Sequence, residues 1–542
     1  MLISPPFLPT ASNNVQDTNQ YIDHTMQGGV VGSGGFPISM AMCWHGGLHL
    51  DAPSAAEPVR AIADGVVVYA GNHGSCIYDN KKYSTGCVVI RHTTEIGANG
   101  DQPVSVTFYS ISQHIIDLYS NIQSGAKVYR KDPIGKAGLI YNKESRIHFE
   151  IIAGDADVAC MMPKLEVQNR KLPLDRDGRS DAIYGQIYFY VPKNTPTYQT
   201  ISITSAQATQ TSHTSADFII GIQYGTGQGG DASVTTYHID GTVMGARTES
   251  NGEYTLYKRA IDMQTLCPSA AYELLRFGRV IGPDALNPAN TPHWRKVVLP
   301  TGAAYLNLAP DAIKKFSDAD FPDWMGWKII DDDIIDDNSR CDSNIIKNLL
   351  QPSEAEYIQA MRYQALYAAD QQGVVTGEKI CQSSTEWLKT AYIENVLKAD
   401  MHKPNQAAWY EQKLCTPAMQ TTLSKTICKF PTEWVKKDLS KRWSWLKEKG
   451  NPYHPTPLNE DGFQKLIDFA GKLCFWEALP EEDQQRLGKK HWHFHPREFI
   501  KHFRQCGWLS GEELAQLLPT HSLRKTNVWK WENVSLKGSA SN

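Results

Sequence analysis

Two histidines stand four residues apart in the segment WHGGLHLDAP, residues 44–53, and an aspartate follows two places later. His45 and His49 lie in a glycine-rich stretch, which favours a strand or a loop over one face of a helix. A catalytic zinc ion takes about three protein ligands with nitrogen, oxygen or sulfur donors and keeps one position open for water. The two histidines therefore suit two of these ligand positions, and Asp51 is a competing donor.

A third ligand is expected on a distant strand. The segment RIHFEI contains His148, and Arg146 points to the same face of that strand because side chains alternate with a period of two. Between these segments, the run FYSISQHII offers His114 as a general base or as a stabiliser of the transition state. These residue types predict a zinc hydrolase site assembled from three separate segments.

The elements that must position these residues form a multidomain α+β chain. Short β-rich runs alternate with turns from Val59 to Ile152, which predicts an antiparallel β domain, placed at residues 41–184 after an irregular lead-in at 1–40. A second β region, 185–310, follows the polar linker KLPLDRDGRSD. Helical spacing of apolar residues, as in DGFQKLIDFAGKLCFWEAL, predicts an all-helical domain at 311–542.

Composition excludes several classes of protein. A chain of 542 residues is too long for one ordinary core. Its net charge of -4 argues against a strongly nucleic-acid-binding surface. No stretch reaches the roughly 18 apolar residues that a membrane span needs, and the first residues lack the basic start of a secretory signal. The eleven cysteines include no CxxC pair, so neither a zinc ribbon nor a disulfide framework is indicated.

The N-terminal motifs resemble those of the LytM/lysostaphin-type zinc metallopeptidases, which cut peptidoglycan. Six segments between about residues 40 and 155 follow that family's order: HGGLHLDAP, PVRAIADGVVVYAG, GCVVIRH, SQHI, SGAKVYRKDPIGKAG and RIHFEI. Six ordered matches at suitable spacing are more specific than any one of them. The resemblance implies an antiparallel β metallopeptidase-like fold, a Zn²⁺ cofactor and a peptidoglycan substrate. It leaves amidase and endopeptidase activity open.

Carried over position by position, the family's metal ligands fall on three histidines, His45, His49 and His148. His49 replaces an aspartate of the family; we prefer it to Asp51, which lies outside the matching position, because neutral imidazole is also a good zinc ligand. His114 occupies the histidine of the family's Y-x-H-L motif. Arg146 replaces a catalytic histidine and cannot accept a proton, but it could stabilise an oxyanion. The alternative is a wall-binding or phage-tail and spike module that has lost its chemistry.

Glu433 stands out in the helical part, within ICKFPTEWVKKDLSKRWSWL and beside Trp434. Lysozyme-like glycosidases use a glutamic acid whose pKa is raised by an apolar surround, together with a second carboxylate. Asp438 is the closest second carboxylate, and Glu386 in SSTEWLK is an alternative acid. The segment HWHFHPREF adds three histidines that form either a second metal site or, as we prefer, a packed aromatic edge: His491, His493 and His495.

Two wider resemblances concern the rest of the chain. The segment HWRKVVLPTGAAYLNL in the middle region resembles Src-homology-3-like wall-binding modules. With the N-terminal motifs and segments such as FSDADFPDWMGW, KFPTEW and WHFHPREF, most of the chain resembles the TseP-type effectors of type VI secretion, which join a LytM-like zinc amidase to a lysozyme-like muramidase. That resemblance implies a second, glycan-cleaving activity at 311–542, and a secretion spike or chaperone and an immunity protein as partners. It also implies synthesis in the cytoplasm without a signal peptide and action in the periplasm of a target bacterium.

Overall fold

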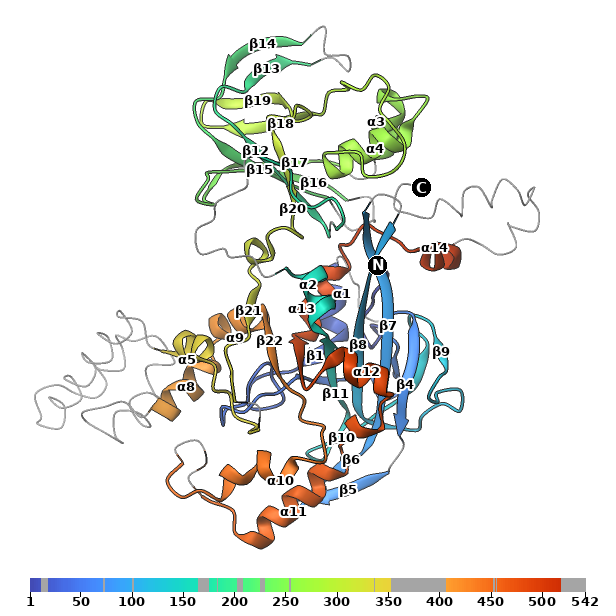
Figure 1. Cartoon of the computed structure of the whole chain (residues 1–542), viewed down its shortest axis with the longest axis vertical. Helices are drawn as coiled ribbons and strands as arrows, with labels where there is room; N and C mark the ends of the chain where they lie inside the picture. Colours follow the sequence, from blue (N-terminus) through green and yellow to red (C-terminus); the bar gives the residue numbers. More distant parts are fainter. Residues whose placement is uncertain are drawn as a thin grey trace, which may run out of the picture.

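One mixed sheet of twelve strands is the framework of the larger part of the molecule, which lies in the lower half of Figure 1. Its strands are β1 (Gln27–Gly28), β2 (Gly47–Asp51), β3 (Pro58–Arg60), β4 (Gly65–Gly71), β7 (Gly86–Asn99), β8 (Gln102–Ile116), β9 (Lys127–Val128), β10 (Pro133–Ile140), β11 (Lys143–Ala153), β21 (Lys328–Ile330), β22 (Thr426–Pro431) and β23 (Lys490–Phe494). The main path runs β21-β22-β23-β11-β10-β8-β7-β4-β9, and β2 pairs with β11 beside it. The antiparallel β domain predicted from the N-terminal motifs is therefore present.

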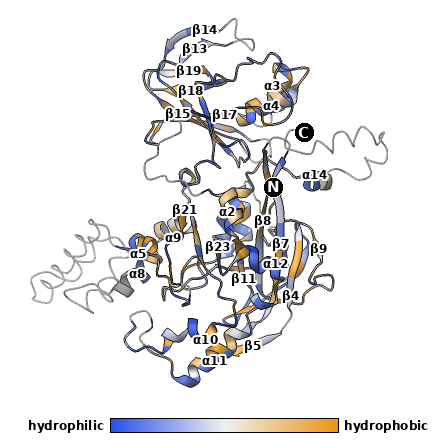
Figure 2. Cartoon of the chain, viewed as in Figure 1, coloured by the Kyte–Doolittle hydropathy of each residue, from blue (hydrophilic) through white to orange (hydrophobic). Residues whose placement is uncertain are grey.

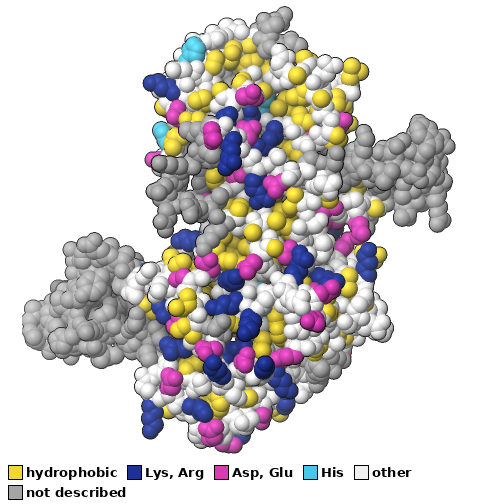
Figure 3. Space-filling model, viewed as in Figure 1, with side chains coloured by type: hydrophobic (Ala, Val, Ile, Leu, Met, Phe, Trp, Pro, Cys, Tyr) yellow, Lys and Arg dark blue, Asp and Glu magenta, His cyan; other side chains and the backbone are white. Residues whose placement is uncertain are grey.

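This computed structural model describes residues 1–10, 18–71, 74–99, 102–163, 175–182, 184–201, 208–224, 230–252, 255–335, 337–351, 406–451, 454 and 456–517. Within these ranges, no helix combines the length and apolar character that crossing a membrane requires. Acidic and basic side chains are interspersed over the face drawn in Figure 3.

The last part of the chain is not all-helical, because three of its segments are strands of the large sheet. Strand β22 pairs antiparallel with β23, and β23 pairs with β11 from Ile151↔Phe494 to Ala153↔Trp492. The prediction missed these strands because short apolar runs such as ICKF look alike in a strand and in a buried helix. Helices are also present in the described residues of this part, as α5 (Asn344–Leu350), α8 (Gln406–Leu414), α9 (Pro417–Ser424), α10 (Leu439–Arg442), α11 (Glu460–Gly471), α12 (Glu481–Leu487), α13 (Pro496–Phe503) and α14 (Gly511–Leu517), whereas positions 352–405 and 518–542 of the predicted helical domain lie outside the described residues.

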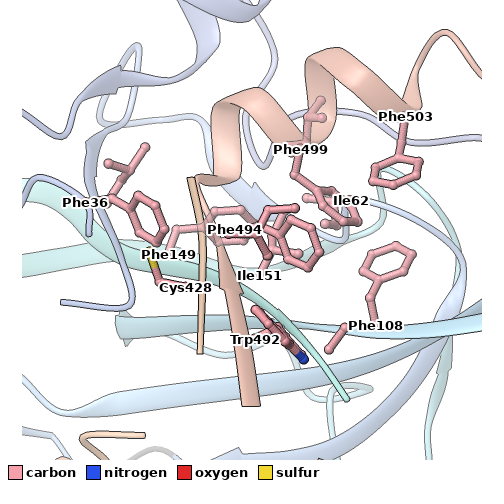
Figure 4. Close-up of a cluster of buried hydrophobic side chains, with 14 of the residues drawn as sticks. Phe36, Ile62, Phe108, Phe149, Ile151, Cys428, Trp492, Phe494, Phe499 and Phe503 are labelled. Carbon is pink, nitrogen blue, oxygen red and sulfur yellow. The ribbon is translucent and has the colours of Figure 1, made fainter. Parts of the chain in front are cut away.

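The main hydrophobic core joins the first residues of the chain and its described C-terminal segments to this sheet. In Figure 4, Phe36 from the predicted lead-in and Phe494 from β23 lie on the same buried cluster as Phe149 of β11. The residues before position 41 are largely irregular, as predicted, but they are not a detached leader, because helix α1 (Thr18–Thr25) buries Ile22 and Thr25 and several apolar side chains around it are buried. Each fully buried phenylalanine contributes about 1.5–3 kcal/mol relative to its exposed state.

Two amphipathic helices, α13 and α11, pack against the strands. Helix α13 buries Phe499 and Phe503, four residues apart, and Phe499 packs on Phe108 of β8 with ring centroids 5.1 Å apart. Helix α11 shows hydrophobic and hydrophilic segments in Figure 2, and its Phe469 stacks on Tyr78 at 4.8 Å. Tyr78 belongs to a hairpin of two strands, β5 (Ser75–Tyr78) and β6 (Lys81–Ser84). A further helix, α2 (Asp155–Met161), follows β11 directly.

The middle region forms a second module, at the top of Figure 1. It contains the strands β12 (Gln186–Val191), β13 (Pro196–Thr200), β14 (Thr209–His213), β15 (Phe218–Gln223), β16 (Ala232–Tyr237), β17 (Val243–Glu249), β18 (Trp294–Leu299), β19 (Gly302–Asn307) and β20 (Lys314–Ser317), and the helices α3 (Leu256–Met263) and α4 (Pro268–Phe277). The sheet orders are β17-β16-β15-β12-β20 and β14-β13-β19-β18. The β region predicted at 185–310 contains the antiparallel strand pair β18–β19. The module extends past position 310, because β20 pairs with β12, and its Src-homology-3-like character stays a prediction.

Candidate metal centre

Three histidine rings converge where β2 pairs with β11. The ring centroids of His45 and His148 are 4.8 Å apart, those of His45 and His49 are 5.1 Å apart, and those of His49 and His148 are 5.3 Å apart. One ring nitrogen of each histidine lies within 4.8 Å of the other two. Strand register accounts for two of them, because His49 of β2 stands directly opposite His148 of β11. The structure thus brings together the three predicted ligands.

The nitrogens of this cluster suit a Zn²⁺ ion. Nδ1 of His45 and Nδ1 of His49 are buried and have no hydrogen-bond partner among the described residues. His148 uses Nε2 in a 2.6 Å hydrogen bond to Glu150, which leaves Nδ1 for a metal. Burial, reinforced by His148, lowers the pKa of His45 to about 3, and burial also lowers that of His49. Both rings are therefore neutral near pH 7, and neutral imidazole is the form that binds zinc.

Glu150 orients His148 from behind. Its Oε1 accepts hydrogen bonds from Nε2 of His148 at 2.6 Å and from the indole Nε1 of Trp434 at 2.7 Å. Burial opposes ionisation of this carboxyl, but His148 and the neighbouring His493 hold the pKa of Glu150 below its usual range. A carboxylate on the distal nitrogen of a metal-binding histidine fixes the ring and raises its basicity. The sequence analysis missed this role, although Glu150 lies two residues after His148 and hence on the same strand face.

Glu433 lies at the same cluster. One of its carboxylate oxygens is within 4.8 Å of ligand atoms of His148 and Glu150. Its Oε1 is buried without a hydrogen-bond partner in the part of the chain that the structure describes. Burial raises the pKa of Glu433 to about 7, against the opposing influence of His148. Glu433 was predicted as the acid of a separate glycan-cleaving site, and the structure places it instead beside the histidines.

His114 is presented by a distortion of the sheet. It is the extra residue of a β-bulge, because Gly86 pairs with Ile115 and the next pair is Cys87 with Gln113. Its φ of 63° lies in the left-handed region, which is rare for a residue with a side chain. Nδ1 lies 2.6 Å from the carbonyl oxygen of Ser84. Since a carbonyl only accepts, we infer that Nδ1 carries the proton and that Nε2 is free to accept one.

The lowered pKa of His114 is consistent with a role as a proton acceptor. Burial lowers its pKa to about 4, although the hydrogen bond to Ser84 opposes the shift. The ring is therefore neutral near pH 7 and able to take up a proton.

Arg146 and Asp51 form an ion pair next to the histidines. The guanidinium Nε and Nη2 donate to the two carboxylate oxygens at 2.7 and 3.2 Å, and Nη1 donates to Oγ of Ser33 at 3.1 Å. Lys143 also reaches Asp51, at 2.8 Å. Because cations engage both oxygens of Asp51, the geometry favours His49 over Asp51 as a ligand. The role of Arg146 as an oxyanion donor stays a prediction.

The remaining predicted residues lie elsewhere or belong to the packing. Asp438 is the N-cap residue of α10 and makes no side-chain capping hydrogen bond. Glu386 lies outside the described residues. His491 stacks on Trp476 with centroids 5.2 Å apart, and His493 stacks on Phe430 at 3.8 Å.

These contacts match the packed aromatic edge that we preferred for the HWHFHPREF segment. His495 caps helix α13 by accepting a hydrogen bond from the backbone N–H of Glu498 at 3.3 Å. Among the residues that the structure describes, the three histidines of this segment belong to no group of potential metal ligands.

Comparison with known proteins identifies the N-terminal domain. Residues 44–160 match the model of peptidase family M23, so this part of the chain is a peptidase M23 domain, as the motifs predicted. Among solved structures, the antimicrobial peptidase lysostaphin from Staphylococcus simulans shows 16% identity over 37% of this chain and 80% of that chain, with a TM-score of 0.14. The NMR solution structure of lysostaphin shows 17% identity over 37% and 79%, also with a TM-score of 0.14. A comparison with curated proteins finds no match.

Proposed function

We propose that this chain is a zinc-dependent peptidoglycan hydrolase with one catalytic centre at the histidine cluster. The observation that carries the proposal is the convergence of His45, His49 and His148 within a peptidase M23 domain. The family match supports a peptide or amide bond of peptidoglycan as the bond that is cut. The buried, unpartnered nitrogens of His45 and His49 support a bound metal ion.

A zinc ion bound here would act as a Lewis acid and would make water more acidic. Residues of the chain itself would orient the ligands and transfer protons. His148 is held in place by Glu150, which keeps the ligand geometry rigid. His114 presents Nε2 as the acceptor for the proton of the attacking water. Glu433 is the second group at the cluster that can hold a proton and pass it to the leaving nitrogen.

Metal analysis and product analysis test the proposal together. We expect about one zinc ion per chain in the purified protein, and very little in His45→Ala or His148→Ala variants. Purified sacculi should release fragments with the wild type and none with these variants. Mass spectrometry of the fragments distinguishes an amidase, which frees the whole stem peptide from the sugar, from an endopeptidase, which cuts within the peptides. A wild-type protein with neither zinc nor product would instead support the wall-binding alternative.

The glycan-cleaving activity of residues 311–542 and the role as a type VI secretion effector stay predictions. The position of Glu433 beside His148 favours one shared centre over a separate pair of Glu433 and Asp438. The strands β22 and β23 belong to the sheet of the M23 domain, so the test needs the full chain. Release of reducing ends from sacculi would reveal a muramidase, and toxicity confined to the periplasm would support an effector with an immunity partner.

A further inference from the structure

We propose that the middle module, residues 186–317, binds the free carboxylate of a peptide in a cavity lined by Arg247, Arg259 and Trp294. The cavity has a volume of about 540 Å³, which is within the usual range for small-ligand sites. It is bounded by strand β17, helix α3 and the β18–β19 hairpin. No residue of the histidine cluster lines it, so its chemistry is separate from the hydrolase centre.

An excess of positive charge is the first reason. Three arginines converge on the single carboxylate of Glu249: Arg247 at 2.9 Å, Arg295 at 3.1 Å and Arg259 at 3.6 Å. Glu249 balances one of these charges and Asp262, which also lines the cavity, can balance a second, so one positive charge stays in excess. Uncompensated charge in a partly buried site is costly, and an anionic ligand would offset that cost.

The arginines differ in their freedom to bind a ligand. Arg295 is completely buried and also donates to the Leu275 carbonyl at 2.9 Å and to Nε2 of His293 at 3.1 Å. Arg259 has 36% of its side chain exposed and the longest of the three contacts to Glu249. Arg259 is therefore the arginine best placed to contact a ligand carboxylate, with Arg295 supplying fixed charge behind it.

Trp294 provides a second, independent indication. Its side chain is 9% exposed and lines the cavity. Its indole Nε1 is buried and finds no acceptor among the described residues. A buried donor without an acceptor costs about 1–3 kcal/mol, which a ligand oxygen would recover. A carboxylate has two oxygens, so it can accept a hydrogen bond from the indole N–H and another from an arginine at the same time.

The rest of the lining favours a peptide over an inorganic anion. Met263, Leu275 and Tyr305 offer apolar contact for a carbon skeleton. Asp262 also lines the cavity and suits a ligand that carries an ammonium group as well. Stem peptides of peptidoglycan carry both free carboxylates and amines. This last identification rests on the proposed hydrolase function, and it makes the module a substrate-holding site.

Calorimetric titration tests the site directly. The probe is a soluble disaccharide-tetrapeptide, titrated into the full chain in EDTA so that it is bound but not cut. We expect Arg259→Gln to weaken binding by at least about tenfold, the loss typical of a charge-assisted hydrogen bond. Lys258→Gln is the matched control, because it removes the same charge from an exposed neighbour on α3 that does not line the cavity. The control should bind like the wild type.

Two further comparisons identify the ligand chemistry. Amidation of the probe's carboxylates should weaken binding by a similar factor, and equimolar inorganic phosphate should not compete. Trp294→Phe keeps the ring and removes the N–H, so weaker binding with an unchanged circular dichroism spectrum separates ligand contact from folding. Equal binding by the Arg259 and Lys258 variants, or of the acid and amidated probes, would overturn the proposal, and competition by phosphate would assign the cavity to a small anion instead.

Zinc content and wall cutting, measured on the same preparations without EDTA, keep the two proposals distinct. A chain that binds no zinc and cuts no sacculi, but still binds the probe, refutes only the hydrolase. A zinc-loaded, active chain that does not bind the probe refutes only the carboxylate site.

Discussion

Trp434 donates its indole N–H to Glu150 at 2.7 Å across 284 positions of the chain, and the same carboxylate oxygen accepts from His148. The hydrogen bond links the segment after β22 to a candidate metal-ligand histidine of the M23 domain. The family match ends at residue 160, whereas this contact and Glu433 come from far beyond it. The C-terminal part is therefore structurally integral to the candidate metal centre.

Trp434→Phe should weaken zinc binding by about tenfold or more, because Glu150 loses a hydrogen-bond donor and His148 becomes less well oriented. Competition with a chromophoric chelator measures the affinity. Trp508→Phe is the matched control, since it removes an indole hydrogen bond to Glu95 at 3.0 Å that does not involve the histidine cluster. Equal affinity of the two variants would contradict the orienting role of Glu150.

Glu433→Gln should keep its zinc but release fragments from sacculi at least about 100-fold more slowly, as expected when a proton-carrying group is lost. Asp438→Asn should leave both zinc content and fragment release near wild-type levels, because Asp438 lies at the start of α10 and in no group of potential metal ligands among the described residues. If both substitutions abolish the release of reducing ends and spare peptide cleavage, the two-carboxylate glycosidase is correct instead.

His114→Gln should lower kcat by about 100-fold or more with little change in zinc content, because the acceptor nitrogen is lost while the three ligands remain. Steady-state kinetics with a soluble wall fragment separates kcat from KM. A variant that loses zinc in parallel would show that His114 supports the ligands and does not transfer a proton.

Truncation after residue 317 should leave the M23 domain unable to fold or to hold zinc. The cut removes β22 and β23, and with them Phe494, which is fully buried against the same core as Phe149. Deleting a buried phenylalanine side chain alone costs about 3–5 kcal/mol. Circular dichroism and metal analysis check the outcome, and a folded, zinc-binding fragment would show that residues 1–317 suffice.

The free energy of unfolding should fall by about 2 kcal/mol between pH 7 and pH 5 through His92 alone. Burial lowers the pKa of His92 in the folded chain to about 4, and an unfolded histidine titrates near 6.5. The unfolded state therefore binds a proton first as the pH falls, so stability is complete above 6.5 and is lost progressively down to about 4. Urea unfolding of the wild type and of His92→Gln should show a shallower pH dependence in the variant; identical slopes would refute the assignment.

The sequence by itself determined the local features of this protein. The order and spacing of six short motifs identified an M23 domain and its three histidines, because strand alternation and metal-ligand types are readable from neighbouring residues. A second β region was predicted at 185–310, and the strand pair β18–β19 lies within it. Helical spacing predicted α11, because that pattern is also readable from neighbouring residues.

Only the tertiary structure decided what surrounds the histidines. The strands β22 and β23 are five or six residues long and apolar, a pattern that does not reveal a partner strand hundreds of positions away. Their pairing with β11 brings Glu433 and Trp434 to Glu150, and a single β-bulge turns His114 into place. Long-range strand pairing and bulges depend on which surfaces pack together in the folded chain, and that information lies in no local stretch of sequence.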